Sequence, residues 1–418
     1  MDMSHVPADD LDFAVLFPMQ DVPNHSHNAH VDWTFDPGRF SVTVNDPVEA
    51  GDEVFNNYGP KGNGELLLGY GFCLPGNPHD SVMLTLKPPP EDLQEQLKRV
   101  HPGYFKPANQ GWDGEKATFH IKQPSAATEG QPNGIFDELP APLLELLTYI
   151  LRHERGLPFH FFEEPLQYLA SPSGSRYLPH VARMIVQSLS PKLAKLHAVE
   201  LPSSPQNERQ QQASIYRAGQ TDILSAAIAS LRTYTRSLVR PATESGARLV
   251  TLEGFRELWA YHSTKSETSV PAFLQGIQAN AGTLDVTQLR MAGWEEDVFV
   301  LALCAAVLEG EEWIRDALPE YVVLDQALGG QRGEDSEILE TEAGDELLEH
   351  AYGLLGIVHT AADALPESVV WTDARWSSGL IALVGKMLLY DSMTMMVPDA
   401  GSGKEEARMA VYMHSMSC

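Results

Sequence analysis

The hydrophobic pattern changes once along this chain, and the change restricts the folds that the chain can adopt. Up to about residue 90, short runs of β-branched and aromatic residues are separated by Pro, Gly, Asn and Asp, which is typical of strands joined by turns. From about Ala141, the apolar residues recur with the period of an amphipathic helix. The pattern therefore predicts an α+β fold, in which a β-rich N-terminal lobe precedes a mainly α-helical C-terminal domain.

The same pattern predicts individual elements. Strands are expected at residues 13–19, 30–35, 39–44, 52–58 and 79–86. A short helix is expected at residues 64–70, capped by Asn63. Longer helices are expected after the Pro-rich stop at residues 88–90, within 176–196, and at 141–156, 207–239, 251–261, 292–318, 345–365 and 375–390.

The length of 418 residues exceeds the roughly 250–300 residues at which a single core stops growing, so several domains are expected. We predict a β-rich lobe at residues 1–90, an irregular linker at 91–140, a helical domain at 141–397 and a flexible tail at 398–418.

The charge and cysteine content limit the partners and the compartment. The chain has 57 acidic and 29 basic residues, and its net charge of −28 argues against nucleic acid as a partner and favours a basic protein partner.

Three scattered cysteines cannot form a disulfide framework or a Cys-rich zinc site, which fits a reducing compartment. The longest apolar run, residues 298–308, is too short to cross a membrane and predicts a buried helix. No signal peptide or basic import run is evident, so we expect a cytoplasmic or nuclear protein.

Two polar turns carry the residues best suited to chemistry. In the first, an apolar run leads into Asp21, Pro23, Asn24 and His25. About thirty residues later, the text "DEVFNNYGPKGNGELLLGYGF" places Tyr58 in an Asn-Asn-Tyr-Gly turn, followed by a glycine-rich turn, a short apolar helix and Tyr-Gly-Phe. An ordinary hairpin requires neither this tyrosine nor the aromatic triplet.

The two motifs "DVPNHS" and "GDEVFNNYGPKGNGELLLGYGF" together resemble the second half of a SET domain. More narrowly, they resemble the Rubisco large-subunit methyltransferase type, which methylates protein lysine with S-adenosylmethionine. The helical text "ASIYRAGQTDILSAAIASLRTYTRSLV" is similar to the substrate-binding region that follows SET in that group. The resemblance implies a protein-lysine N-methyltransferase that acts on a protein substrate with a basic, Lys-containing segment.

The resemblance also implies roles for individual residues. In this family the two segments cross, which would place Tyr58 beside the methyl sulfonium of the cofactor as the catalytic residue. Tyr70 and Phe72 would line the apolar channel that admits the lysine stem. The resemblance also implies that Asn24, His25 and Phe72 contact the cofactor. Asp21 and Tyr70 would contact the substrate.

Each of these residues has a plainer interpretation as well. Tyr58 is also compatible with an aromatic residue at a strand end, Asn24 with a turn residue, and His25 with a structural histidine. The spacing of His25, His27 and His30 raises the alternative of a metal site, but loop histidines at such spacing more often face solvent, so we predict no metal.

The chain departs from the family in one respect. Only twenty-three residues precede Asn24, whereas relatives carry a long N-terminal half with a glycine-containing loop that holds the cofactor. We therefore expect an N-terminally truncated or degenerate member that holds S-adenosylmethionine poorly by itself. Two alternatives to lysine methylation stay open, a non-catalytic protein-binding module with a relic SET lobe and a protein-histidine methyltransferase.

Overall fold

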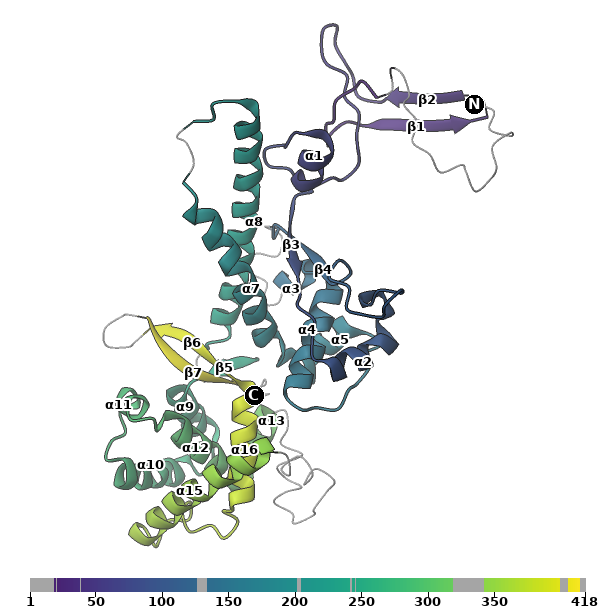
Figure 1. Ribbon diagram of the computed structural model, residues 1–418. Helices are drawn as coiled ribbons and strands as arrows, with labels where there is room; N and C mark the ends of the chain where they lie inside the picture. Colours follow the sequence, from purple (N-terminus) through teal and green to yellow (C-terminus); the bar gives the residue numbers. More distant parts are fainter. Residues whose placement is uncertain are drawn as a thin grey trace. The chain divides into compact units, whose positions relative to one another are not determined.

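The structure is a computed structural model, and it describes residues 19, 21–37, 39–125, 134–200, 204–240, 243–244, 246–318, 342–398 and 405–413 (Figure 1). It confirms the predicted α+β class, with small sheets and a largely helical C-terminal region. The chain forms two compact units. The first comprises Met1–Leu84, Phe119–Pro124 and Leu189–Ala227, and the second comprises Thr85–Thr118, Ser125–Ser188 and Ile228–Cys418.

Two pairs of strands, β1-β2 and β3-β4, and one short helix organise the β-rich part of the first unit. Its elements are β1 (Val31–Asp36), β2 (Arg39–Val44), α1 (Asn63–Tyr70), β3 (Ser81–Thr85) and β4 (Thr118–Lys122). In the hairpin of β1 and β2, Phe35 pairs with Phe40 and their ring centroids are 4.8 Å apart. Helix α1 ends at Gly71, whose φ of 82° is the left-handed conformation that glycine adopts at low cost.

The segment Leu189–Ala227 of this unit includes the C-terminal part of α7 (Leu178–Ala198) and most of α8 (Glu208–Ser237). The guanidinium group of Arg217 on α8 donates to the carbonyl oxygens of Leu196 and Val199, the latter at 2.7 Å. A cation thus satisfies carbonyl groups that the end of α7 leaves without intrahelical partners.

Some predicted elements differ from the structure. Residues 52–58 form no strand and make a single isolated bridge, between Asn56 and His25. Within residues 91–140, assigned to an irregular linker, α2 (Glu91–Val100) is the helix expected after the Pro-rich stop, whereas the 3₁₀ helix η2 (Pro102–Tyr104), β4 and α3 (Gly134–Glu138) were not expected. Of the strand predicted at residues 13–19, all but Met19 lies outside the described residues.

The second unit is mainly helical. Beyond α2, η2 and α3, its shorter N-terminal helices are α4 (Ala141–Glu154), α5 (Pro165–Ala170) and α6 (Pro172–Ser175). The later helices are α9 (Leu252–His262), α10 (Ser266–Ala281), α11 (Val286–Met291), α12 (Glu295–Glu309), α13 (Glu312–Ala317), α15 (Glu342–Ala364) and α16 (Ser378–Asp391). Every residue of α12 from Val298 to Leu308 is buried, which confirms the predicted buried helix.

A three-stranded sheet accompanies these helices, with the strands in the order β5-β7-β6 (Figure 1). Its strands are β5 (Arg248–Val250), β6 (Ser392–Pro398) and β7 (Glu405–Met413). The expectation of a flexible tail is wrong for β7, because this strand is the central one and its residues from Ala410 to Met413 are buried.

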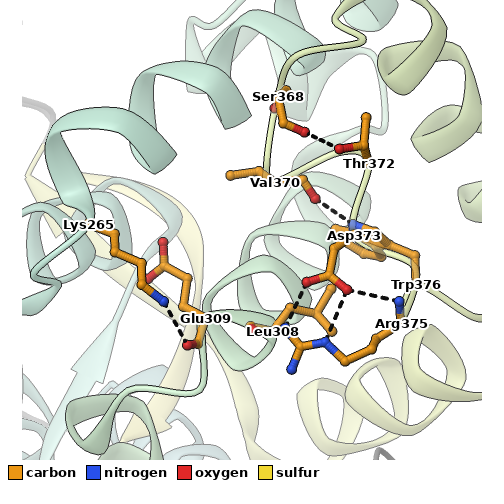
Figure 2. A network of polar contacts seen from close by, with 9 residues as sticks. All are labelled: Lys265, Leu308, Glu309, Ser368, Val370, Thr372, Asp373, Arg375 and Trp376. Carbon is orange, nitrogen blue, oxygen red and sulfur yellow. Dashed lines mark hydrogen bonds and ion pairs between the residues drawn. The ribbon is translucent and has the colours of Figure 1, made fainter.

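Polar side chains fix the C-terminal end of α12 (Figure 2). Arg375 donates to the carbonyl oxygen of Leu308 and to both carboxylate oxygens of Asp373, at 3.0 and 2.7 Å. The hydrogen bond from Arg375 lowers the pKa of the Asp373 carboxyl group. Lys265 Nζ donates to the carbonyl oxygen of Glu309 at 3.2 Å, so two cations meet the negative end of the helix dipole.

A buried ion pair anchors the end of α16. Asp391 is 2% exposed, and its carboxylate accepts hydrogen bonds from Arg176 at 3.1 and 2.6 Å and lies 3.3 Å from Arg155. Removing one partner from such a buried pair leaves an uncompensated charge, so these residues act as a unit. No helix within the described residues combines the length and apolar character that crossing a bilayer requires.

We predict that Gly276→Ala destabilises the second unit. A Cβ atom at this position of α10 would lie 2.2–2.7 Å from the indole of the buried Trp371. The overpacking should lower the free energy of unfolding by about 1–3 kcal/mol, measured by urea denaturation with tryptophan fluorescence. The control is Gly353→Ala in α15, where a Cβ meets no atom within 4 Å, and it should raise stability by about 0.5–1 kcal/mol. Equal effects of the two substitutions would contradict the packing shown here.

Candidate functional site

The two turns singled out in the sequence lie against each other in the first unit. The backbone N–H of Asn56 donates to the carbonyl oxygen of Asn24 at 2.8 Å, and the N–H of Ser26 donates to the carbonyl oxygen of Asn56 at 2.9 Å. These two bonds form the isolated parallel bridge between His25 and Asn56. The turn that carries Tyr58 is thereby tied to the loop that carries Asn24 and His25.

His25 is the buried residue at this crossing, with 5% of its surface exposed. Its Nδ1 accepts a hydrogen bond from the backbone N–H of Tyr58 at 3.1 Å, so the neutral ring carries its proton on Nε2. Burial lowers the pKa of His25, opposed by the backbone of Asn56, while the positive charges of His27, His79 and Lys61 lower it further. His25 is therefore held as a neutral imidazole, and its Nε2 is buried without a hydrogen-bond partner among the described residues.

Tyr58 lies flat against this imidazole. The ring centroids of His25 and Tyr58 are 5.1 Å apart with an interplanar angle of 21°. The Tyr58 hydroxyl donates to the carbonyl oxygen of Pro23 at 2.9 Å. Burial, the neighbouring Tyr70 and the charge of Asp21 raise the pKa of Tyr58, so the phenol stays protonated near neutral pH. Its oxygen keeps the capacity to accept a hydrogen bond from a further donor.

Two further aromatic rings extend the same surface. The Tyr70 ring lies 4.8 Å from the Tyr58 ring, and Phe72 lies 6.3 Å from Tyr70 and 6.4 Å from His25, as measured between centroids. Tyr70 is 51% exposed, so this end of the cluster is open to solvent. The structure thus gathers four residues that the sequence analysis selected into one contiguous cluster of rings.

The two remaining predicted residues stand at the edge of this cluster. Asn24 is exposed, and its side-chain amide donates to Glu53 at 2.6 Å while its backbone belongs to the crossing. Asp21 is exposed and lies close enough for its charge to act on the Tyr58 hydroxyl. Their predicted roles in binding stay predictions.

The sequence analysis missed Asn57, which fastens the two turns together. Its side-chain amide donates to the carbonyl oxygens of Ala29 at 3.2 Å and His27 at 3.4 Å. Its Oδ1 accepts the N–H of Gly59 at 2.9 Å, and Gly59 has a φ of 92°, which a side chain would strain. The consecutive asparagines before Tyr58 were the available signal, because amide side chains readily bond to nearby backbone groups in turns.

A second asparagine has a different function from the one predicted. Asn63 does not cap α1, because it is the first residue of the helix and Gly62 occupies the cap position. Its backbone N–H instead donates to Oδ1 of Asp80 at 3.1 Å, and its side chain bonds to Leu74 and to Oδ2 of Asp80. Asp80 therefore supplies the acceptor that starts the helix carrying Tyr70.

The histidines near the crossing form no metal site in the part of the chain that the structure describes, where no group of three His, Cys, Asp or Glu residues could hold an ion. An open cavity of about 530 Å³ adjoins the crossing, and His30, Asn57, Gly59 and His79 are among the residues that line it. The site thus consists of a neutral imidazole, a protonated phenol, an aromatic surface and an adjoining polar cavity.

Comparison with known proteins identifies relatives of one kind. The chain is 27% identical over 308 residues to the protein named ribosomal lysine N-methyltransferase set10 of Schizosaccharomyces pombe, an alignment covering 71% of this chain and 52% of the relative. It is 27% identical over 253 residues to ribosomal lysine N-methyltransferase 1 of Saccharomyces cerevisiae, covering 57% and 40%. It is also 35% identical over 77 residues to SET domain-containing protein 4 of Artemia parthenogenetica, covering 18% and 19%.

The chain is related to SET-domain lysine methyltransferases. No family model matches it. Because the chain spans about half or less of the length of the two ribosomal lysine methyltransferases, the activity and substrates of those proteins come to it only as a proposal.

We predict that the crossing loosens in acid. The pKa of His25 is lowered on folding, so the neutral ring stabilises the folded state above the unfolded value of about 6.5. This stability is lost as the pH falls from about 6.5 through the pKa of His25 in the folded state. Protonation of Nδ1 removes the hydrogen bond that it accepts from the Tyr58 N–H. Hydrogen exchange at the Tyr58 amide, corrected for intrinsic pH dependence, should accelerate over this range.

The matched control is His25→Asn, whose amide oxygen can accept the same N–H but does not titrate. Its Tyr58 amide should show no corresponding acid step. A His25 titration midpoint at or above 6.5, measured by NMR of the imidazole, would contradict the assignment.

Proposed function

We propose that this chain acts as a SET protein-lysine N-methyltransferase that uses S-adenosylmethionine, of the type that resembles Rubisco large-subunit methyltransferase, and that its residues 1–90 supply the C-terminal part of the SET domain. The observation that carries the proposal is the placement of Tyr58, whose ring lies on His25 and whose hydroxyl is fixed by the carbonyl oxygen of Pro23. Relatives named lysine N-methyltransferases support it independently.

The chemistry requires a neutral lysine amine, although free lysine has a pKa of about 10.4. The rings of Tyr58, Tyr70 and Phe72 would replace part of the water around a docked amine, which favours its uncharged form, and the positive charge of a bound sulfonium would act in the same direction. The Tyr58 hydroxyl donates its hydrogen to the carbonyl oxygen of Pro23. Its own oxygen can therefore accept a hydrogen bond from the amine N–H and direct the nitrogen lone pair. Positioning of this kind contributes several kcal/mol to catalysis.

The residues present fit one side of the cofactor. Buried Nε2 of His25 is a donor without a partner among the described residues, which is a feature that a ligand can satisfy. Phe72 is partly exposed and offers apolar surface to a purine, and Asn24 stands at the edge of the crossing. When bound, S-adenosylmethionine supplies an electrophilic methyl group on a sulfonium. His25, Phe72 and Asn24 would hold it, while Tyr58 orients the acceptor.

The substrate that we propose is a protein with a basic segment. The chain carries a net charge of −28, which attracts basic sequences and disfavours nucleic acid. Two relatives are named ribosomal lysine methyltransferases, so lysines of ribosomal proteins are the first substrates to test. Such a protein would work in the cytoplasm or nucleus.

A histidine acceptor and a non-catalytic binding module are the two competing proposals. Incubation of the protein with labelled S-adenosylmethionine and ribosomal proteins, followed by mass spectrometry, separates them. Methyl groups on lysine support the proposal, and methyl groups on histidine replace it with the first alternative. Absence of both transfer and cofactor binding, measured by calorimetry on an enzyme with a complete SET domain, supports the binding module.

In an enzyme with a complete SET domain, we predict that Tyr58→Phe lowers turnover by about 10²-fold or more, because the amine loses the group that orients it. Affinity for S-adenosylmethionine should stay within about twofold, since the aromatic ring is retained. The control is Tyr70→Phe, which also keeps its ring and whose hydroxyl has no hydrogen bond among the described residues. It should change turnover only a few-fold. Similar losses for both variants would remove the special role given to Tyr58.

A further inference from the structure

A second cavity in the first unit has a lining suited to a basic side chain. It measures about 340 Å³, the lower end of the range for ligand sites, and lies between the loop at residues 75–80 and helix α8. Two of its lining residues are acidic, Asp80 and Asp222, and no basic residue is among the described residues that line it. It is separate from the ring cluster of Tyr58, and nothing in the proposed reaction uses it.

Asp80 is a buried carboxylate with unused acceptor capacity. It is 6% exposed, and its Oδ1 already accepts from the backbone N–H groups of Asn63 and Ser81 at 3.1 and 3.0 Å. Among the described residues, its Oδ2 accepts only from the side chain of Asn63, at 3.2 Å. A carboxylate oxygen can accept a second bond, so Oδ2 can receive a donor from the cavity.

Asp222 adds a carboxylate that has no hydrogen bond or ion pair within the described part of the chain. One turn earlier on the same helix, Gly219 keeps the wall open, because a Cβ there would lie 2.7 Å from Oδ2 of Asp80. Ile215, Ile223 and Pro75 supply apolar walls. Acidic groups with apolar walls match a side chain that carries a cationic head on an aliphatic stem.

We propose that this cavity binds an arginine or lysine side chain of the protein partner, at a position other than the lysine to be methylated. The identity of that partner as a methylation substrate rests on the proposed function, whereas the cation site itself does not. Its head would bond to Asp80 and Asp222, and its stem would pack on Ile215 and Ile223. The net charge of the whole chain favours the approach of a basic segment.

Binding is tested without cofactor or methyl transfer, so the result is independent of whether the chain is an enzyme. The full chain, labelled on isoleucine methyl groups, is titrated with the capped tripeptide acetyl-Gly-Arg-Gly-amide and with its neutral isostere that contains citrulline. The methyl signals of Ile215 and Ile223 should shift, and the arginine peptide should bind about tenfold more tightly. Equal affinities, or shifts confined to other isoleucines, would overturn the proposal.

Two substitutions on α8 complete the experiment. Asp222 is exposed, and Asp222→Asn should reduce the preference for the arginine peptide to less than about threefold. Glu208→Gln removes one exposed negative charge from the same helix outside the cavity and should leave the preference unchanged. An equal loss in both variants would show a general charge effect and refute a defined site. Free arginine is a further ligand to test, and tighter binding of it than of the capped peptide would refute a protein partner.

Discussion

The hydrogen bond from the Tyr58 backbone to the His25 imidazole is the interaction on which the candidate site depends. It joins residues 33 positions apart, fixes the neutral ring tautomer and brings the phenol onto the imidazole face. The bridge between His25 and Asn56 places the two turns, and Asn57 ties the second turn to the backbone of the first. Because these bonds run between two irregular segments, side-chain amides and one imidazole replace the ladder of a regular sheet.

A second polar group, the carboxylate of Asp80, positions the helix that carries the aromatic residue Tyr70. The carboxylate of Asp80 holds the first residue of α1, and the last residue of that helix is Tyr70. Tyr70 therefore depends on an acid that lies ten residues beyond it in the sequence. Positioning of a ring by a short helix with a fixed start is more accurate than positioning by a free loop, which is what orientation of an amine requires.

The hydrophobic pattern of the sequence was sufficient to predict those strands and helices that neighbouring residues determine. The strand predicted at residues 39–44 has the observed bounds, and most helices predicted from apolar period lie close to those found, but the one predicted at 292–318 is two helices, α12 and α13, and α10 was not predicted. The crossing required the family resemblance, because no local rule joins residues so far apart. Asn63 shows why other predictions failed. Its ability to cap a helix was evident from the sequence, but its hydrogen-bond partner Asp80 was not. Strand β7 was missed because its pairing with Arg248–Val250 and with β6 exists only in the folded chain.

Asp80 links the aromatic cluster and the second cavity, the two places where we propose that a protein partner binds. Its Oδ1 fixes the start of α1, and its Oδ2 faces Gly219 and lines the second cavity. A cation bound there would meet the same carboxylate that supports the helix leading to Tyr70. Recognition of a basic side chain and alignment of the aromatic surface would then share one charged group. Such an arrangement couples binding of the correct partner to the geometry of the acceptor site, because a ligand shifts an equilibrium only through contacts that differ between the states.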